Sequence, residues 1–146
     1  MAHAAAEGAA QESGVKVSIV GAADAEPADL LAADGFIFAA PENLASMSGP
    51  MKDFFDRCYY PVLERLNGRP CAIMVCAGSD GAGAARQIKR ILTGWRLRLI
   101  AEPVIVCTHA QSPEAILAPK TITAQDRAAC TDLGAAFAAG LASGIF

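Results

Sequence analysis

The sequence has few of the features that mark secreted, membrane-bound or nucleic-acid-binding proteins. Only 18% of its 146 residues are charged and the formal net charge is −3, so no basic field is present to attract nucleic acid or an anionic membrane. No apolar run is long enough to span a bilayer, and the Ala-rich start lacks the segments of a signal peptide. We therefore expect a cytoplasmic protein without nucleic-acid or membrane partners.

Paired cysteines and metal-binding spacings are also absent. The five cysteines are an odd number, and none stands in a CxxC or a His-paired arrangement. Cys71, Cys76 and Cys107 lie in apolar, strand-like runs, where a thiol usually acts as a small hydrophobic side chain. These patterns predict reduced, structural cysteines and no bound metal.

Short apolar runs alternate with amphipathic stretches along the chain, which is 53% hydrophobic. The predicted strands are Val15–Val20, Gly35–Ala40, Pro70–Ala77 and Leu99–Thr108. Pro103 cannot donate to a strand ladder, so the last of these is expected at a sheet edge. Nearly continuous apolar strands are typical of parallel sheets covered by helices on both faces. We predict one α/β domain over residues 1–146.

Two helices are predicted from apolar stripes at three- and four-residue steps. Pro50 suits the first turn of a helix whose stripe runs from Met51 to Leu66, and Pro61 is expected to kink or split that helix. A second stripe runs from Ala84 to Trp95, with Trp95 in the core and a basic face beginning at Arg86 turned to solvent.

A third helix is predicted to begin at Thr123, with Asp126 as the acidic member of a capping box. The residues expected to pack inward are Ala128, Leu133, Ala136, Phe137 and Leu141. In parallel α/β sheets, ligands bind beyond the carboxyl ends of the strands. That rule directs attention to the loops that follow Ala40 and Ala77.

Both loops are rich in small residues. Pro41–Gly49 contains no large aromatic side chain, so its backbone amides could reach a flat polar ring, although a plain strand-to-helix connection fits equally well. Ala77–Gly83 has three glycines, which allow close backbone approach at a helix N-terminus. Its order is GxxGxG, which differs from the GxGxxG of dinucleotide-binding proteins and is weak as an isolated motif.

The run PENLASMSGPMKDFFDR and the following YYPVLERLNGRPCAIMVCAGSDGAGAARQI resemble the flavodoxin-like family, which includes NAD(P)H-dependent FMN reductases and quinone reductases. The P-x(5)-M-x-G-x-x-K-x-F-x-D-R pattern over Pro41–Arg57 is the more specific part. The resemblance implies a three-layer α/β/α fold with a parallel sheet of order 2-1-3-4-5 and FMN across its carboxyl edge. It implies cofactor-binding residues on one side of the ring at Glu42, Asn43, Leu44, Ala45, Ser46 and Met47, and on the other at Gly78, Ser79, Asp80 and Gly81.

The family's first strand and the phosphate-binding loop after it have no counterpart in this sequence. Residues 1–14 resemble only the later part of the family's first helix, so Val15–Val20 would be its second strand. In the family's sheet, the missing first strand would lie in the centre, between the strands Val15–Val20 and Gly35–Ala40. Two explanations remain open: a longer protein whose reading frame begins upstream of Met1, or a natural short form. FMN held only through its ring would bind weakly.

The resemblance implies an FMN-dependent oxidoreductase that passes electrons from NAD(P)H to a quinone or another small acceptor. The catalytic residues are unknown: Asp80 and His109 are candidate proton donors, but Asp80 also fits a helix cap and His109 a solvent-facing position. One alternative is a flavodoxin-type one-electron carrier, which the small net charge and the lack of aromatic residues in both loops disfavour. Another is a cofactor-free interaction module. The bare loops suggest a flavin face open to substrate or covered by another subunit, so a homo-oligomer is expected.

Overall fold

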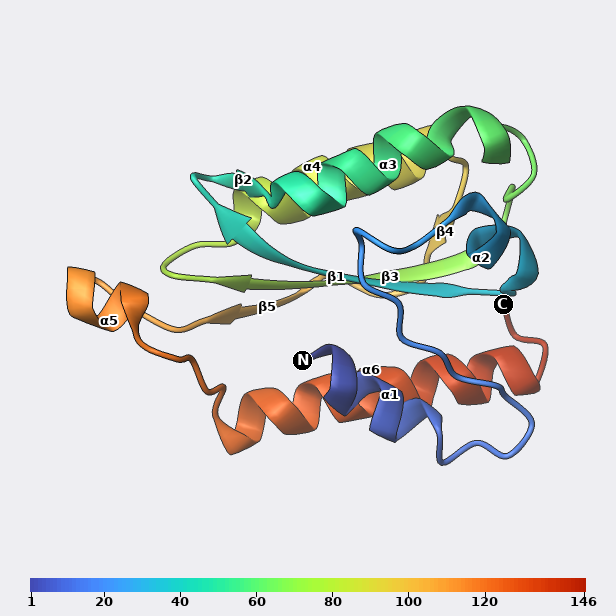
Figure 1. The fold of residues 1–146 in the computed structure, drawn as a ribbon. Helices are drawn as coiled ribbons and strands as arrows, with labels where there is room; N and C mark the ends of the chain where they lie inside the picture. The colour runs from blue at the N-terminus through green and yellow to red at the C-terminus, as the bar shows by residue number, and fades with distance from the viewer.

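The computed structural model describes residues 1–146 and arranges them in three layers. A sheet lies in the middle, with α3 (Gly49–Val62) and α4 (Ala82–Gly94) on one face. The other face is covered by α1 (Ala2–Ala9) and α6 (Ala124–Ala142) (Figure 1). This arrangement confirms the predicted α/β/α architecture. No helix has both the length and the apolar composition needed to cross a bilayer.

The sheet has five strands and is mostly parallel. The strands are β1 (Phe36–Asn43), β2 (Ser46–Met47), β3 (Pro70–Ala77), β4 (Arg98–Leu99) and β5 (Val104–Cys107). They follow the order β2-β1-β3-β4, with β5 also beside β3. β1, β4 and β5 all run parallel to β3. The predicted strand Leu99–Thr108 is interrupted around Pro103, so that β4 lies at its start and β5 near its end. The edge position predicted from that proline is confirmed.

The predicted strand Val15–Val20 is wrong. From Lys16 to Val20 the backbone makes no hydrogen bond within the chain, and the side chains of Ile19 and Val20 are 49% and 45% exposed. The outer edge of β1 is equally unpaired from Phe36 to Pro41, because β2 pairs only with the last two residues of β1, Glu42 and Asn43. An apolar, β-branched run becomes a strand only where a neighbouring backbone completes the ladder. This run has no such neighbour.

The larger core lies between the sheet and the helices α3 and α4. Aromatic rings contact one another within it: the rings of Phe55 and Trp95 are 5.2 Å apart, and Phe38 lies 5.5 Å from Phe55. Trp95 is only 6% exposed, which confirms its predicted place in the core. The helix α3 continues through Pro61 to Val62, so the proline lies near its end and does not split it.

On the other face, α1 lies against α6 in a close, mostly small-residue contact. The capping box of Thr123 and Asp126 at the start of α6 is confirmed, as is the burial of Phe137. Ala128 and Ala136 are exposed, contrary to prediction. The buried positions of α6 are Cys130, Gly134, Phe137, Ala138 and Gly140. Small residues on this face let the backbone of α1 approach closely, so the buried stripe is not the most apolar one.

The fold also has two short helices, and two arginines bind the chain segment that precedes β1. The helix α2 (Pro27–Ala32) lies before β1, and α5 (Pro113–Leu117) projects beyond the end of β5. Arg57 of α3 donates to the backbone oxygens of Ala22 and Ala25 at 2.9 and 3.1 Å. Arg69 donates to the carbonyl oxygen of Leu30 at 2.8 Å. These bonds fasten the chain before β1 to the body of the molecule.

Candidate functional site

The predicted loop Pro41–Gly49 is for the most part a β-hairpin. β1 continues to Asn43, and Glu42 and Asn43 pair with Met47 and Ser46 of β2. The two residues of the turn, Leu44 and Ala45, have φ angles of 51° and 59°. Tight two-residue hairpins require this left-handed conformation, which usually selects Asn or Gly and costs other residues about 1–2 kcal/mol each. The hairpin tip is therefore strained, and the side chain of Leu44 is fully exposed there.

The second loop joins β3 to α4 through Gly78, Ser79, Asp80 and Gly81. Gly81 has a φ of 78°, and a Cβ at this position would lie 2.5 Å from Cγ2 of Ile105. Both the backbone conformation and the space therefore require glycine. Asp80 accepts a bond from the Ala82 amide at 3.3 Å, which supports its predicted capping role.

The hairpin and the second loop are tied together by two side chains. The carboxylate of Glu42 accepts hydrogen bonds from the amides of Gly81 and Ala84, both at 2.9 Å. The amide oxygen of Gln87, one turn further along α4, accepts from the Ser46 hydroxyl at 2.8 Å and from the Met47 amide at 3.0 Å. The two predicted halves of the site therefore form one connected unit.

Close backbone contact completes that unit. A Cβ on Gly83 would lie 2.3 Å from the carbonyl oxygen of Ala45 and 3.1 Å from Oε2 of Glu42. Any side chain at position 83 would push the hairpin away from α4. The sequence drew attention to the glycines of this loop, but nothing in it marked Gln87, which follows the loop on an ordinary helical face.

All ten predicted site residues lie at the carboxyl ends of β1 and β3, which are adjacent strands (Figure 1). Their side chains serve different purposes. Glu42 and Ser46 bond to α4 or to its side chains, while Met47 is 6% exposed and belongs to the core. Leu44 is exposed at the tip of the hairpin. The side chains thus build the loops, and the backbone is what remains available to a ligand.

Five backbone amides, in the hairpin turn and in the segment between β3 and Gly81, donate no hydrogen bond within the chain. They are those of Leu44, Ala45, Gly78, Ser79 and Asp80. Unpaired N–H groups that protein atoms do not cover can bond to water or to a ligand acceptor. A flavin ring carries acceptors at O2, O4 and N5, so this small-residue, donor-rich edge fits the ring. Neither loop contains a lysine or arginine to meet a phosphate.

A third loop lies beside the second. The Thr108 amide donates to the carbonyl oxygen of Ala77 at 2.9 Å and its hydroxyl to the same oxygen at 3.3 Å. His109 follows in a left-handed conformation, with a φ of 53°, and is exposed. The solvent-facing alternative for this histidine is therefore confirmed. Beyond it, α5 exposes Ile116 and Leu117, which are 57% and 85% accessible.

The cysteines lie in strands and helices, and all five are free thiols. Burial raises the pKa of the Cys71 thiol from 9.0 to about 11, and it also raises the pKa of Cys58 and Cys130. A raised pKa leaves these groups as neutral thiols, which are poor nucleophiles. No cluster of three or more His, Cys, Asp or Glu residues is placed to hold a metal ion.

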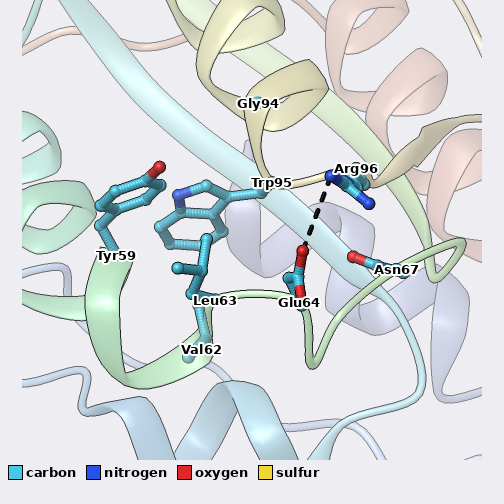
Figure 2. Close-up of a pocket in the computed structure, with 8 residues that line it drawn as sticks. All are labelled: Tyr59, Val62, Leu63, Glu64, Asn67, Gly94, Trp95 and Arg96. Atoms are coloured by element: carbon cyan, nitrogen blue, oxygen red, sulfur yellow. Dashed lines mark ion pairs between the residues drawn. The ribbon is translucent and has the colours of Figure 1, made fainter.

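Two hollows lie between α3 and α4, away from the loops. The hollow in Figure 2 is bordered by Tyr59, Trp95 and the ion pair of Glu64 with Arg96, whose nitrogen and oxygen are 3.7 Å apart. Its volume is about 10 Å³, the space of one water molecule. The adjoining groove along α3 and α4 has about 200 Å³, less than the roughly 300–1,000 Å³ of a typical ligand pocket. Neither hollow suits a nucleotide-sized ligand.

Solved structures share this fold. A flavodoxin from the domain Archaea superposes with a TM-score of 0.72 at 18% identity, covering 96% of this chain and 87% of the other. A WrbA-like flavodoxin from Agrobacterium tumefaciens superposes with a TM-score of 0.73 at 18% identity, covering 98% of this chain and 87% of the other. The fold is therefore flavodoxin-like, as the sequence predicted.

The chain belongs to the NADPH-dependent FMN reductase family, whose profile matches residues 27–111. Among curated relatives, a flavodoxin from Aquifex aeolicus is 31% identical over 93 residues, which are 64% of this chain and 50% of that protein. A probable NAD(P)H dehydrogenase (quinone) from Arabidopsis thaliana is 40% identical over 57 residues, 38% of this chain and 21% of that protein. The chain thus spans half or less of the length of these relatives.

Proposed function

We propose that this protein binds FMN through its ring at the two loops and passes electrons from NAD(P)H to a small acceptor such as a quinone. The observation that carries the proposal is the set of unpaired amides, from Leu44 and Ala45 and from Gly78 to Asp80, on two loops tied together at the carboxyl edge. Family membership over residues 27–111 supports the same chemistry.

In this proposal the protein positions the flavin and the cofactor supplies the redox chemistry. The free amides would orient the ring and stabilise negative charge on its oxygen and nitrogen acceptors. The carbonyl oxygen of Ala77 already accepts hydrogen bonds from Thr108, which hold the end of β3 against the loop after β5. No side chain of the two loops is required to take part in hydride transfer.

The nature of the exposed residues around the edge favours an apolar acceptor. Leu44 is fully exposed at the hairpin tip, and Ile116 and Leu117 are largely exposed on α5. Apolar side chains at the rim of a site gain free energy by covering an apolar substrate. A quinone satisfies this requirement better than a charged electron acceptor does.

Spectroscopy tests the proposal directly. The purified protein is titrated with FMN while the visible absorbance and the fluorescence of the flavin are recorded, and a shifted, saturable signal is expected at micromolar FMN. Oxidation of NADPH is then followed with and without a quinone. If the flavin signal shows no saturable change, the proposal is wrong for this polypeptide.

A flavodoxin-type one-electron carrier is the second candidate, and the match to the Aquifex aeolicus flavodoxin favours it. The same experiment separates the two candidates. A carrier binds FMN but does not turn over NADPH with a quinone, whereas a reductase does both.

A further inference from the structure

Glu42 occupies an unusual position for a residue at the end of a sheet strand. Its two carboxylate oxygens accept one hydrogen bond each, from the amides of Gly81 and Ala84 at 2.9 Å. Those amides belong to the N-terminal end of α4, where Asp80 accepts from the Ala82 amide and Glu42 from two further N–H groups that the helix leaves unpaired. The carboxylate also complements the positive end of the helix dipole. Glu42 therefore caps a helix that lies 39 or more residues further along the chain.

This contact determines where the hairpin lies relative to the second loop. The hairpin tip approaches α4 so closely that only glycine fits at position 83, and Gln87 holds its far strand. Leu44 and Ala45 meanwhile keep strained, left-handed conformations. Strain of this kind persists only where surrounding contacts hold it. Glu42 supplies the only charged contact that joins the hairpin to the helix.

We propose that Glu42 is a positioning residue of the site: it aligns the free amides of the hairpin with those of Gly78–Asp80 so that both rows meet one ligand ring. This inference rests on the proposed flavin site and adds to it. The Glu42 side chain then contributes through α4 and the second loop rather than by touching the ring, while the resemblance implied only that residue 42 borders the ring.

A second consequence concerns the phosphate of the ligand. Helix N-termini often bind phosphate, but the first turn of α4 is already occupied by the Glu42 carboxylate. A phosphate at this position would be repelled by the negative charge of Glu42, and the Gly81 and Ala84 amides already donate to that carboxylate. The α4 terminus is therefore not available to the phosphate of the ligand.

The test compares Glu42→Gln with the unchanged protein and with Glu64→Gln. A glutamine amide can accept one of the two hydrogen bonds, but its NH₂ group then faces the other N–H donor. Glu64 is the matched control because it is exposed, forms a single ion pair with Arg96, and lies beside the hollow of Figure 2. The same chemical change is thus made far from the loops.

Hydrogen exchange of the flavin-free protein gives the first result. In Glu42→Gln, the amides of Gly81 and Ala84 are expected to exchange faster, while the amides of β3 keep their protection. Glu64→Gln is expected to leave all of them unchanged. Unchanged exchange at Gly81 and Ala84 in Glu42→Gln would overturn the proposed contact, whether or not the protein binds a flavin.

Flavin titration gives the second result. We expect Glu42→Gln to weaken FMN and riboflavin binding by a similar factor of about tenfold, as for loss of a hydrogen bond to a charged group. The difference spectrum of the bound ring should also change, which a purely structural effect on folding would not cause. Equal affinity and an equal spectrum in the variant would overturn the positioning role. Failure of the unchanged protein to bind either flavin would overturn the proposed function, and with it this role, while the exchange result still decides whether the contact exists.

Discussion

At the scale of single residues, Gly81 shows how strongly one position can be constrained. Its φ of 78° is unfavourable for any other residue, and the space for a Cβ is taken by Cγ2 of Ile105 at 2.5 Å. The two constraints have different origins, since one belongs to the local backbone and the other to a strand that follows later in the chain. They can therefore be separated by experiment.

Gly81→Ala is expected to lower the free energy of unfolding by about 2–4 kcal/mol, from the left-handed backbone and the steric clash together. Ile105→Ala in the same chain removes the clash and should restore part of the loss. Urea unfolding of the four proteins in a double-mutant cycle measures the coupling. If the two substitutions are strictly additive, the clash with Ile105 does not contribute.

A second prediction at this scale concerns alkaline pH. Burial raises the pKa of the Cys71 thiol from 9.0 to about 11, so the unfolded chain loses this proton first as the pH rises. The buried, protonated Cys71 thiol therefore adds its full contribution to the free energy of unfolding below about pH 9. That contribution is lost between pH 9 and 11. The slope is at most about 1.4 kcal/mol per pH unit.

Cys71→Ala removes this titration. Urea unfolding across the same pH range should show that the stability difference between the unchanged protein and the variant shrinks above pH 9. Cys58 and Cys130 also have a raised pKa, so some alkaline loss is expected in both proteins. A difference that stays constant with pH would contradict the assignment to Cys71.

At the scale of elements, the pair formed by α1 and α6 depends on two glycines. A Cβ on Gly134 would lie 1.9 Å from the carbonyl oxygen of Ala5, and one on Gly8 would lie 2.0 Å from that of Thr131. Backbone atoms of one helix thus occupy the space of a side chain on the other. The helices cannot keep this distance if either glycine is replaced.

Gly134→Ala is expected to destabilise the protein by about 1–3 kcal/mol, because the helices must separate or shift. Gly94→Ala is the control: it lies in a helix too, but no atom comes within 4 Å of its Cβ position. By helix propensity alone, alanine there should leave stability unchanged or raise it by up to about 1 kcal/mol. Thermal unfolding followed by circular dichroism compares the two. Equal midpoints would show that α1 does not hold α6 closely in solution.

At the scale of the whole molecule, one side of the sheet is open. The outer edge of β1 from Phe36 to Pro41 has no partner, and the extended segment from Lys16 to Val20 makes no backbone hydrogen bond. Ile19 and Val20 on that segment are about half exposed. Unpaired edges and exposed apolar residues favour pairing between chains. We therefore expect the protein to self-associate.

Sedimentation velocity over a range of concentrations measures this association. The double substitution Ile19→Lys and Val20→Lys should weaken it, because a charge on an extended segment opposes edge pairing. Leu63→Lys is the control, since Leu63 is similarly exposed at 48% but lies at the end of α3. A chain that remains monomeric at every concentration, or an equal effect of Leu63→Lys, would contradict the prediction.

The sequence by itself determined the elements whose signals are local. β3 matches the predicted Pro70–Ala77 at both ends, because its apolar run is bounded by Pro70 and a glycine. The capping box at Thr123 and the buried stripe of α4 likewise follow from residues close together in the chain. The positions of the two candidate loops were predicted for the same reason, since each lies at the end of a clear strand.

Only the tertiary structure decided features that depend on contacts between distant residues. Val15–Val20 has the composition of a strand, but no neighbouring backbone completes it. Gly134 is buried because α1 lies against it, which overrides the apolar pattern of α6. Glu42 was predicted to border the flavin, and no local pattern indicated that its carboxylate accepts hydrogen bonds from α4, from partners 39 and 42 positions away. Local pattern sets backbone conformation, whereas the position of a helix end relative to a strand depends on the packing of the whole chain.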